Sequence, residues 1–155
     1  MSLGLYLHIP YCFSKCRYCD FYSAPGQRGV PRAYVDALLR ELSRFAPDAP
    51  LRPDTLYFGG GTPSLLRPEQ AKRLIDAARP MPGAEITLEA NPETVTEESL
   101  AGFREAGVNR ISFGVQSARD TQLRTLGRPH TAKQARAAFA AARRAGFANI
   151  SGDIM

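Results

Sequence analysis

Short apolar segments alternate along this chain with longer segments whose apolar residues recur at helical spacing. The short segments are predicted to be strands and cover 5–10, 55–59, 85–90, 110–115 and a fifth segment from Asn149. Strands that alternate with helices in one chain usually form a parallel sheet. The pattern therefore predicts an α/β fold made of consecutive βα units.

Four helices are predicted between these strands. In two of them, after Pro31 and after Pro68, apolar residues recur with the period of an amphipathic helix. Thr96 is the expected N-cap of the third helix, and the fourth covers 132–145. A loop is expected after the first helix, where the prolines are Pro47, Pro50 and Pro53.

Side chains alternate between the two faces of a strand, so each predicted strand contributes two sets of residues. The apolar set should pack beneath the helices and consists of Leu5, Leu7, Ile9, Leu56, Phe58, Ile86, Leu88, Ala90, Ile111, Phe113, Val115, Ile150 and Ile154. The opposite set is polar and consists of Tyr6, His8, Thr55, Tyr57, Thr87, Glu89, Ser112, Gln116, Ser151 and Asp153. Barrels of βα units normally fill their interior with apolar side chains. A polar interior predicts a cavity that holds a polar ligand.

All three cysteines of the chain lie in one short segment, Cys12-Phe13-Ser14-Lys15-Cys16-Arg17-Tyr18-Cys19. Spacers of three and two residues allow the thiolates to converge on a metal or an iron–sulfur centre. Three thiolates can ligate three corners of a [4Fe–4S] cluster and leave one iron without a protein ligand. Such an iron is a place where a small molecule can bind and react.

Three other interpretations of the cysteines compete with the cluster. A disulfide framework favours an even number of cysteines in a secreted protein, whereas this number is odd and no secretory signal is visible. A zinc site could use His8 as its fourth ligand, although the spacing is unusual for zinc ribbons. The remaining interpretation is three buried thiols with a packing role only.

The residues with distinctive chemistry all follow predicted strands. The cysteines follow the first strand and the glycines 59–61 follow the second, while Glu89, Gln116 and Asp153 lie at the ends of the next three. Ligand sites of βα barrels form at the carboxyl ends of the strands. Five separate elements therefore predict a single site.

The segment from Tyr6-Leu7-His8-Ile9-Pro10-Tyr11-Cys12 through Cys19-Asp20-Phe21 resembles the radical S-adenosylmethionine (SAM) superfamily. Within it, essentially the whole chain is similar to the oxygen-independent coproporphyrinogen III oxidases and the related heme chaperones called HemW. The true oxidases carry a further cysteine where this chain has Phe21. That difference favours the heme-chaperone branch. A porphyrinogen oxidase is the alternative, and a zinc-binding structural module is the alternative from another class.

The resemblance implies two cofactors, a [4Fe–4S] cluster on Cys12, Cys16 and Cys19 and SAM bound beside it. It implies SAM contacts from Tyr6, Tyr18, Gly60, Gly61, Thr62, Glu89, Gln116, Arg128 and Asp153. In the family pattern the glycine stretch and the glutamate meet the ammonium group of SAM. The glutamine and the aspartate meet the ribose hydroxyls, and the arginine meets the carboxylate. One tyrosine lies near the cluster, and the backbone of the other meets adenine.

The residues alone leave alternatives to several of these roles. Glu89 could form a buried salt bridge with Arg110, and an arginine in a loop, such as Arg128, is commonly solvated. His8 and His130 are expected to be hydrogen-bonded structural histidines rather than ligands.

Composition adds limits to this interpretation. The net charge of +5 comes from arginines spread along the chain, so we expect no DNA or RNA partner. No apolar run has transmembrane length, and clustered thiols favour a reducing compartment, the cytoplasm. The resemblance further implies an electron donor and heme or a porphyrinogen as ligand.

The family core has six βα units and is followed by a C-terminal domain, whereas this sequence reaches only the fifth strand. We therefore expect residues 1–155 to be the N-terminal part of a radical SAM core. The expected fold is a partial (βα)6 TIM-like barrel that is truncated at about strand five. We expect such a chain to be inactive alone.

Overall fold

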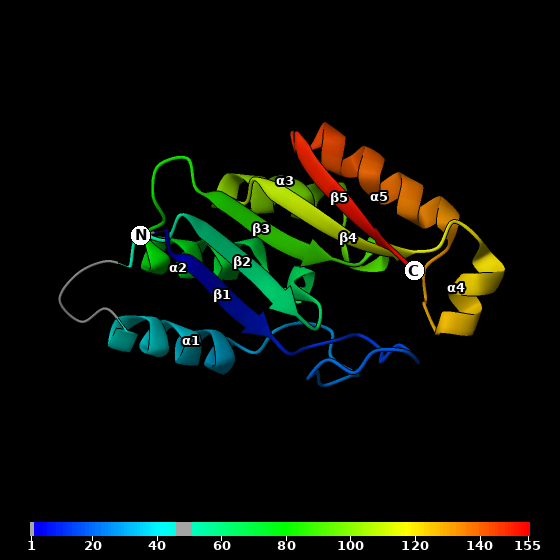
Figure 1. Ribbon diagram of the computed structural model, residues 1–155, viewed down its shortest axis with the longest axis horizontal. Coiled ribbons are helices and arrows are strands. Elements are labelled where there is room, and N and C mark those ends of the chain that lie inside the picture. The colour runs from blue at the N-terminus through cyan, green and yellow to red at the C-terminus, as the bar shows by residue number, and fades with distance from the viewer. Residues whose placement is uncertain (1, 46–50) are drawn as a thin grey trace.

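The computed structural model describes residues 2–45 and 51–155, so the expected loop positions Pro47 and Pro50 lie outside the described residues. Its centre is one parallel sheet in the order β1-β2-β3-β4-β5 (Figure 1). The strands are β1 Gly4–Ile9, β2 Thr55–Gly60, β3 Glu85–Ala90, β4 Arg110–Gln116 and β5 Asn149–Ile154. Each strand pairs with the next one in the sequence, which confirms the predicted α/β fold of consecutive βα units.

Four of the connecting helices pack along one face of this sheet, in the order α1, α2, α3 and α5 (Figure 1). They are α1 Arg32–Phe45, α2 Pro68–Ala78, α3 Glu97–Ala106 and α5 Ala132–Arg144. Two 3-10 turns, η1 Pro63–Leu65 and η2 Pro92–Thr94, follow β2 and β3. No helix within residues 2–45 and 51–155 combines the length and the apolar character needed to cross a membrane.

The ends of α3 are fixed by Thr96, which was the predicted N-cap, and by Gly107. The Thr96 hydroxyl accepts a hydrogen bond from the backbone N–H of Ser99 at 3.1 Å, and Gly107 ends the helix with a φ of 113°. A further short helix, α4 Asp120–Leu126, was not predicted. It lacks a side-chain cap and buries only Leu123, so it carries little of the periodic signal that identifies a helix.

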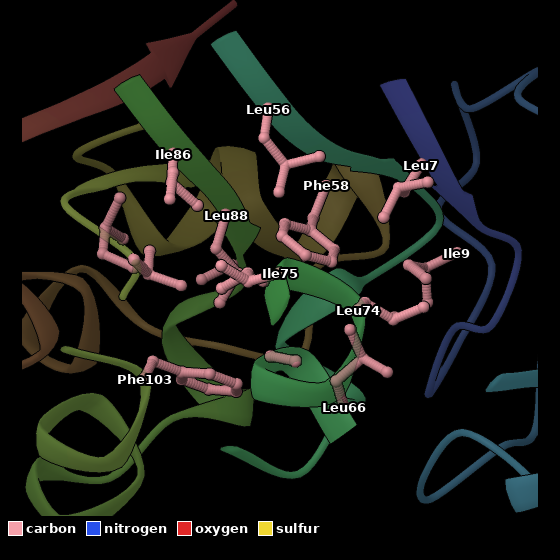
Figure 2. Close-up of a cluster of buried hydrophobic side chains, with 14 of the residues drawn as sticks. Leu7, Ile9, Leu56, Phe58, Leu66, Leu74, Ile75, Ile86, Leu88 and Phe103 are labelled. Carbon is pink, nitrogen blue, oxygen red and sulfur yellow. The ribbon is translucent and has the colours of Figure 1, made fainter. Parts of the chain in front are cut away.

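The apolar strand residues and the helices form one hydrophobic core (Figure 2). Phe58 and Leu88 of the sheet are fully buried, together with Leu74 of α2 and Phe103 of α3. Burying each such side chain contributes about 1.5–3 kcal/mol of transfer free energy. The prediction was wrong for Ile154, which is 78% exposed, because β5 is an edge strand and the described chain supplies no element beyond it.

The opposite face of the sheet is polar, as strand parity predicted. Arg110 donates hydrogen bonds to the hydroxyls of Thr87 at 3.2 Å and Ser151 at 3.0 Å, and Ser151 donates in turn to Ser112 at 2.9 Å. These contacts join side chains of three neighbouring strands. The polar residues therefore satisfy one another across the sheet instead of packing in an apolar interior.

Gly61 allows the end of β2 to approach the segment that carries the first cysteine. Its backbone N–H donates to the carbonyl of Ile9 at 2.9 Å, and the N–H of Thr62 donates to the carbonyl of Tyr11 at 2.8 Å. A Cβ atom at Gly61 would lie only 2.7 Å from the Tyr11 carbonyl oxygen and 2.9 Å from that of Ile9. Both obstacles are backbone atoms, so a side chain at this position cannot be accommodated by a rotamer change.

We therefore expect Gly61→Ala to lower the free energy of unfolding by about 1–3 kcal/mol, the usual cost of overpacking. Gly29→Ala is the matched control, because its Cβ would meet nothing closer than an oxygen at 3.9 Å. That variant should stay within about 0.5 kcal/mol of the wild type. Urea unfolding of the three proteins measures the difference. Equal stability of the two variants would contradict the close approach.

Candidate functional site

A cavity lies at the carboxyl ends of the strands, where the predicted residues meet. Figure 1 shows the loop after β1, helix α4 and the C-terminus at the end toward which the strand arrows point. Every predicted site residue except Tyr6 lines this cavity: Cys12, Cys16, Tyr18, Cys19, Gly60, Gly61, Thr62, Glu89, Gln116, Arg128 and Asp153. These side chains come from the cysteine loop, from four further strand ends and from the loop after α4. The rim of the sheet thus brings together residues that are far apart in the sequence.

The cysteine loop is held by backbone hydrogen bonds on both sides. The N–H of Cys12 donates to the carbonyl of Ala24 at 3.0 Å, and the N–H of Arg17 donates to the carbonyl of Leu126, the last residue of α4, at 3.1 Å. All three cysteines are free thiols; Cys12 is buried and the other two are half-buried. Their sulfur atoms are therefore available at the wall of the cavity.

The thiols are not gathered around one point. Within residues 2–45 and 51–155, no three histidine, cysteine or acidic side chains lie close enough to hold a single metal ion. His8, the proposed fourth zinc ligand, instead contacts the Tyr6 hydroxyl at 3.3 Å and the Tyr22 carbonyl at 3.0 Å. His8 is therefore engaged with two other hydrogen-bond partners. A zinc ion requires four donors at one centre, whereas the cysteines of a cubane cluster bind separate irons.

Arg128 lies inside the cavity wall and is only 8% exposed, so the alternative of a solvated loop residue was wrong. Its Nη1 donates to the Cys16 sulfur at 3.3 Å, and its Nη2 donates to the Asn91 side-chain oxygen at 2.6 Å and to the Gly114 carbonyl at 2.8 Å. Its Nε is buried without a hydrogen-bond partner among the described residues. A buried N–H of a cation that lacks a partner is costly unless a ligand accepts from it.

The charge of Arg128 is retained despite its burial. Burial alone would lower the pKa of this guanidinium, but the hydrogen bond to Cys16 and the negative charge of Glu93 outweigh it and raise the pKa above its ordinary value. The cavity therefore contains a permanent cation beside the cysteines.

Asn91 is a site residue that the analysis of the sequence missed. Its side-chain N–H donates to the Thr62 hydroxyl at 3.1 Å, and that hydroxyl donates to the Cys12 sulfur at 3.6 Å. The Asn91 oxygen accepts from Arg128 at the same time. Its position directly after β3, at the rim of the sheet, was the one available signal.

The Glu89 carboxylate lies beside Gly60, the last residue of β2, and is fixed by two hydrogen bonds. One carboxylate oxygen accepts from the Tyr57 hydroxyl at 2.8 Å, and the other accepts from the backbone N–H of Gly60 at 3.2 Å. Arg110, its suggested ion-pair partner, lies instead 4.0 Å from Glu85. The salt-bridge alternative for Glu89 was therefore wrong.

Gln116 and Asp153 border the cavity on the last two strands. Gln116 has a φ of 64°, in the left-handed region that non-glycine residues rarely adopt, and the register between β4 and β5 shifts beside it. Such backbone conformations are uncommon and concentrate at functional sites. Beside this shift, Gln116 and Asp153 both line the cavity.

The two predicted tyrosines occupy different places. Tyr6 is 53% exposed and stacks on Tyr57 with ring centroids 6.0 Å apart, outside the residues that line the cavity. Tyr18 does line the cavity, and burial raises the pKa of its phenol while the nearby Arg128 opposes that shift. The structure therefore brings Tyr18, but not Tyr6, to the predicted site.

His130 is a structural histidine, as expected. It is 2% exposed, with Nδ1 at 3.2 Å from a carboxylate oxygen of Glu93 and Nε2 at 3.1 Å from the carbonyl of Val115. These contacts join the loop before α5 to η2 and to the end of β4. His130 therefore helps to hold the segment that carries Arg128.

The chemistry of the cavity fits a cluster and a zwitterionic ligand. Three free thiols supply iron ligands, the Arg128 guanidinium can bind a carboxylate, and the Glu89 carboxylate can accept from an ammonium group. The sheet and this rim cavity define a βα domain of the barrel type, which binds ligands at the carboxyl ends of its strands. A family model described as the Radical SAM superfamily matches residues 6–155. The chain belongs to the radical SAM superfamily.

Relatives and solved structures agree with this assignment. The chain is 43% identical over 159 residues to the heme chaperone HemW of Escherichia coli (strain K12), with 99% of this chain and 42% of the relative covered. It is 41% identical over 157 residues to HemW of Bacillus subtilis (strain 168), with 97% and 41% covered. The structure of the E. coli coproporphyrinogen III oxidase HemN, a radical SAM enzyme, matches with a TM-score of 0.84 and 32% identity. That match covers 99% of this chain and 37% of HemN, so the chain spans about two fifths of its relatives.

The Tyr57–Glu89 contact predicts a specific pH dependence. Burial and then the hydrogen bond to Glu89 raise the pKa of Tyr57 in the folded protein. The unfolded state therefore loses this proton first as the pH rises above about 10, and the stabilisation is lost progressively above that pH. We expect Tyr57→Phe to destabilise the protein at pH 8 and to differ less from the wild type at pH 11. Urea unfolding at both pH values tests this, with Tyr22→Phe as an exposed control. A stability difference that does not change with pH would contradict the contact.

Proposed function

We propose that this chain binds a [4Fe–4S] cluster through Cys12, Cys16 and Cys19 and binds SAM beside it, as part of a heme chaperone. The observation that carries the proposal is the buried guanidinium of Arg128. It contacts the Cys16 sulfur, and its Nε has no partner within residues 2–45 and 51–155. A cation in this position is suited to an anionic ligand bound next to the cysteines. Membership of the radical SAM superfamily supports the same pair of cofactors.

The side chains around the cavity suggest how SAM would be held. Arg128 would donate to the carboxylate of SAM, and Glu89, together with Gly60, Gly61 and Thr62, would accept from its amino group. The amino and carboxylate groups would also bind the iron that lacks a cysteine. Gln116 and Asp153 would bind the ribose hydroxyls. Tyr18 would contribute backbone contacts to adenine, while Tyr6 stacks outside the cavity and would act only beside the cluster. Once bound and reduced, the cluster supplies the electron for reductive cleavage of SAM.

Heme is the proposed cargo. The HemW relatives, at 43% and 41% identity, carry the name heme chaperone. Phe21, which takes the place of the additional cysteine of the oxidases, supports this branch and lines the cavity. The second candidate is a coproporphyrinogen oxidase, which the 32% identity and TM-score of 0.84 with HemN favour. An electron donor would act on the cluster in either case, and the reduced thiols favour the cytoplasm.

The proposal is tested by anaerobic reconstitution with iron and sulfide, followed by iron analysis and EPR with and without SAM. We expect about four irons per chain and a reduced-cluster signal that changes when SAM is added. Cys16→Ser should lose most of the bound iron, whereas Ser14→Ala, in the same loop, should keep it. The chemistry of thiolate ligation explains this difference, because a hydroxyl is a poor iron ligand.

Two results would refute the proposal. Zinc in place of iron would indicate a structural metal module. A cluster whose EPR signal does not change with SAM would show that SAM does not bind beside it. Heme titration by visible absorbance and a coproporphyrinogen decarboxylation assay, both with the full-length form, then separate the two branches. Heme binding without decarboxylation of coproporphyrinogen supports the chaperone, and decarboxylation supports the oxidase.

A further inference from the structure

Two short segments of the chain pair side by side at the cavity through equivalent positions. One is Asn91-Pro92-Glu93 after β3, and the other is Arg128-Pro129-His130 after α4. Their first residues are joined by the 2.6 Å hydrogen bond from Arg128 to Asn91, and their third residues by the 3.2 Å contact between His130 and Glu93. Proline at the centre of each segment fixes φ there. We call Arg128 and Asn91 the inner pair. The contact between His130 and Glu93, together with the two prolines, therefore holds the inner pair in place.

The inner pair connects to two of the cysteines. From Arg128, Nη1 donates to the sulfur of Cys16 at 3.3 Å. From Asn91, the side-chain N–H donates to the Thr62 hydroxyl at 3.1 Å, which donates to the sulfur of Cys12 at 3.6 Å. Asn91 is therefore connected by hydrogen bonds to two sulfur atoms, to that of Cys16 through Arg128 and to that of Cys12 through Thr62.

The donor and acceptor groups of the side chains fix the direction of each hydrogen bond between Arg128, Asn91, Thr62 and Cys12. A guanidinium can only donate, so the Asn91 atom that faces Arg128 must be the amide oxygen. The amide nitrogen must then face Thr62 and donate to its hydroxyl. Because the Thr62 hydroxyl receives that hydrogen, its own proton is directed to Cys12. Asn91 therefore orients the donor on Cys12 and anchors the donor on Cys16.

Hydrogen bonds to the sulfurs of an iron–sulfur cluster help to set its reduction potential. Donors withdraw negative charge from the thiolates and stabilise the reduced state, which carries one more electron. The effect is enhanced here because Thr62 is 2% exposed and Arg128 is 8% exposed, so water screens neither donor well.

We infer that Asn91 is a positioning residue that directs one hydrogen bond to Cys12 through Thr62 and one to Cys16 through Arg128, and thereby raises the reduction potential of the cluster. This inference rests on the proposed function, because it requires a cluster on these cysteines. It adds a residue that contacts neither the iron nor SAM in the proposed arrangement.

The test is a redox titration of the reconstituted protein without SAM, monitored by EPR. We expect Asn91→Leu to decrease the ratio of reduced to oxidised cluster at the wild-type midpoint by about tenfold, which is about 59 mV for a one-electron couple. Thr62→Val should shift the potential in the same direction by less, and Thr62→Ser should restore it. The double variant Asn91→Leu with Thr62→Val should shift the potential by less than the sum of the two single shifts, because both substitutions act on the same donor to Cys12.

Asn109→Leu is the matched control for a loss of structure. The Asn109 side-chain amide also forms two hydrogen bonds of 2.8 Å: it accepts one from the backbone N–H of Ile86 and donates one to the carbonyl of Ala84. Asn109 lies just before β4, at the other end of the sheet. Its variant should lower the melting temperature without changing the potential. A similar shift in that variant would overturn the inference, since general loosening would then explain the result.

The remaining outcomes are also decisive. An unchanged potential in Asn91→Leu, at full iron content, overturns the inference and leaves the proposed function intact. If Asn91→Leu does not fold, the pair Thr62→Val and Thr62→Ser decides, and equal potentials in those two variants overturn it. A wild-type protein without a cluster refutes the proposed function and this inference together, which iron analysis of the wild type identifies first.

Discussion

The buried guanidinium of Arg128 is the interaction on which the arrangement of this cavity depends. A cation removed from water is strongly destabilising unless its N–H groups are paired. Arg128 satisfies most of this requirement with groups from three other segments, the cysteine loop, the residue after β3 and the backbone of β4. A single side chain thereby fixes the relative positions of four segments that are distant in the sequence.

The backbone around the cysteines is held by hydrogen bonds to neighbouring segments. Gly61 and Thr62 donate to the carbonyls of Ile9 and Tyr11, and Arg17 donates to the end of α4. These contacts fix the first half of the loop, which carries Cys12 and Cys16. The buried sheet beneath the loop provides the rigid support, because its apolar side chains are packed against the helices.

Strand parity allowed much of the fold and the cavity to be predicted. Alternation in the sequence separated the core from the polar face, and the strand ends identified the rim that carries Glu89 and Asp153. Prediction failed where local signals were weak. Helix α4 buries one side chain, and Ile154 lies on an edge strand, so neither followed the expected pattern.

Tertiary contacts were the part that the sequence could not provide. Parity placed Tyr6 on the polar face correctly, but Tyr6 stacks on Tyr57 and does not line the cavity. The role of Asn91 depends on partners that are 29 and 37 residues away in the sequence, Thr62 and Arg128. Periodicity describes one element at a time, so it contains no information about such pairings.

The central claim is that the cavity holds a cluster with one iron open to SAM. Electron–nuclear double resonance of the reduced protein tests it most directly, with SAM that carries nitrogen-15 in its amino group and oxygen-17 in its carboxylate. We predict hyperfine coupling from both labels, because both groups would bind the iron that lacks a cysteine. A reduced cluster that shows no coupling to either label would contradict the claim.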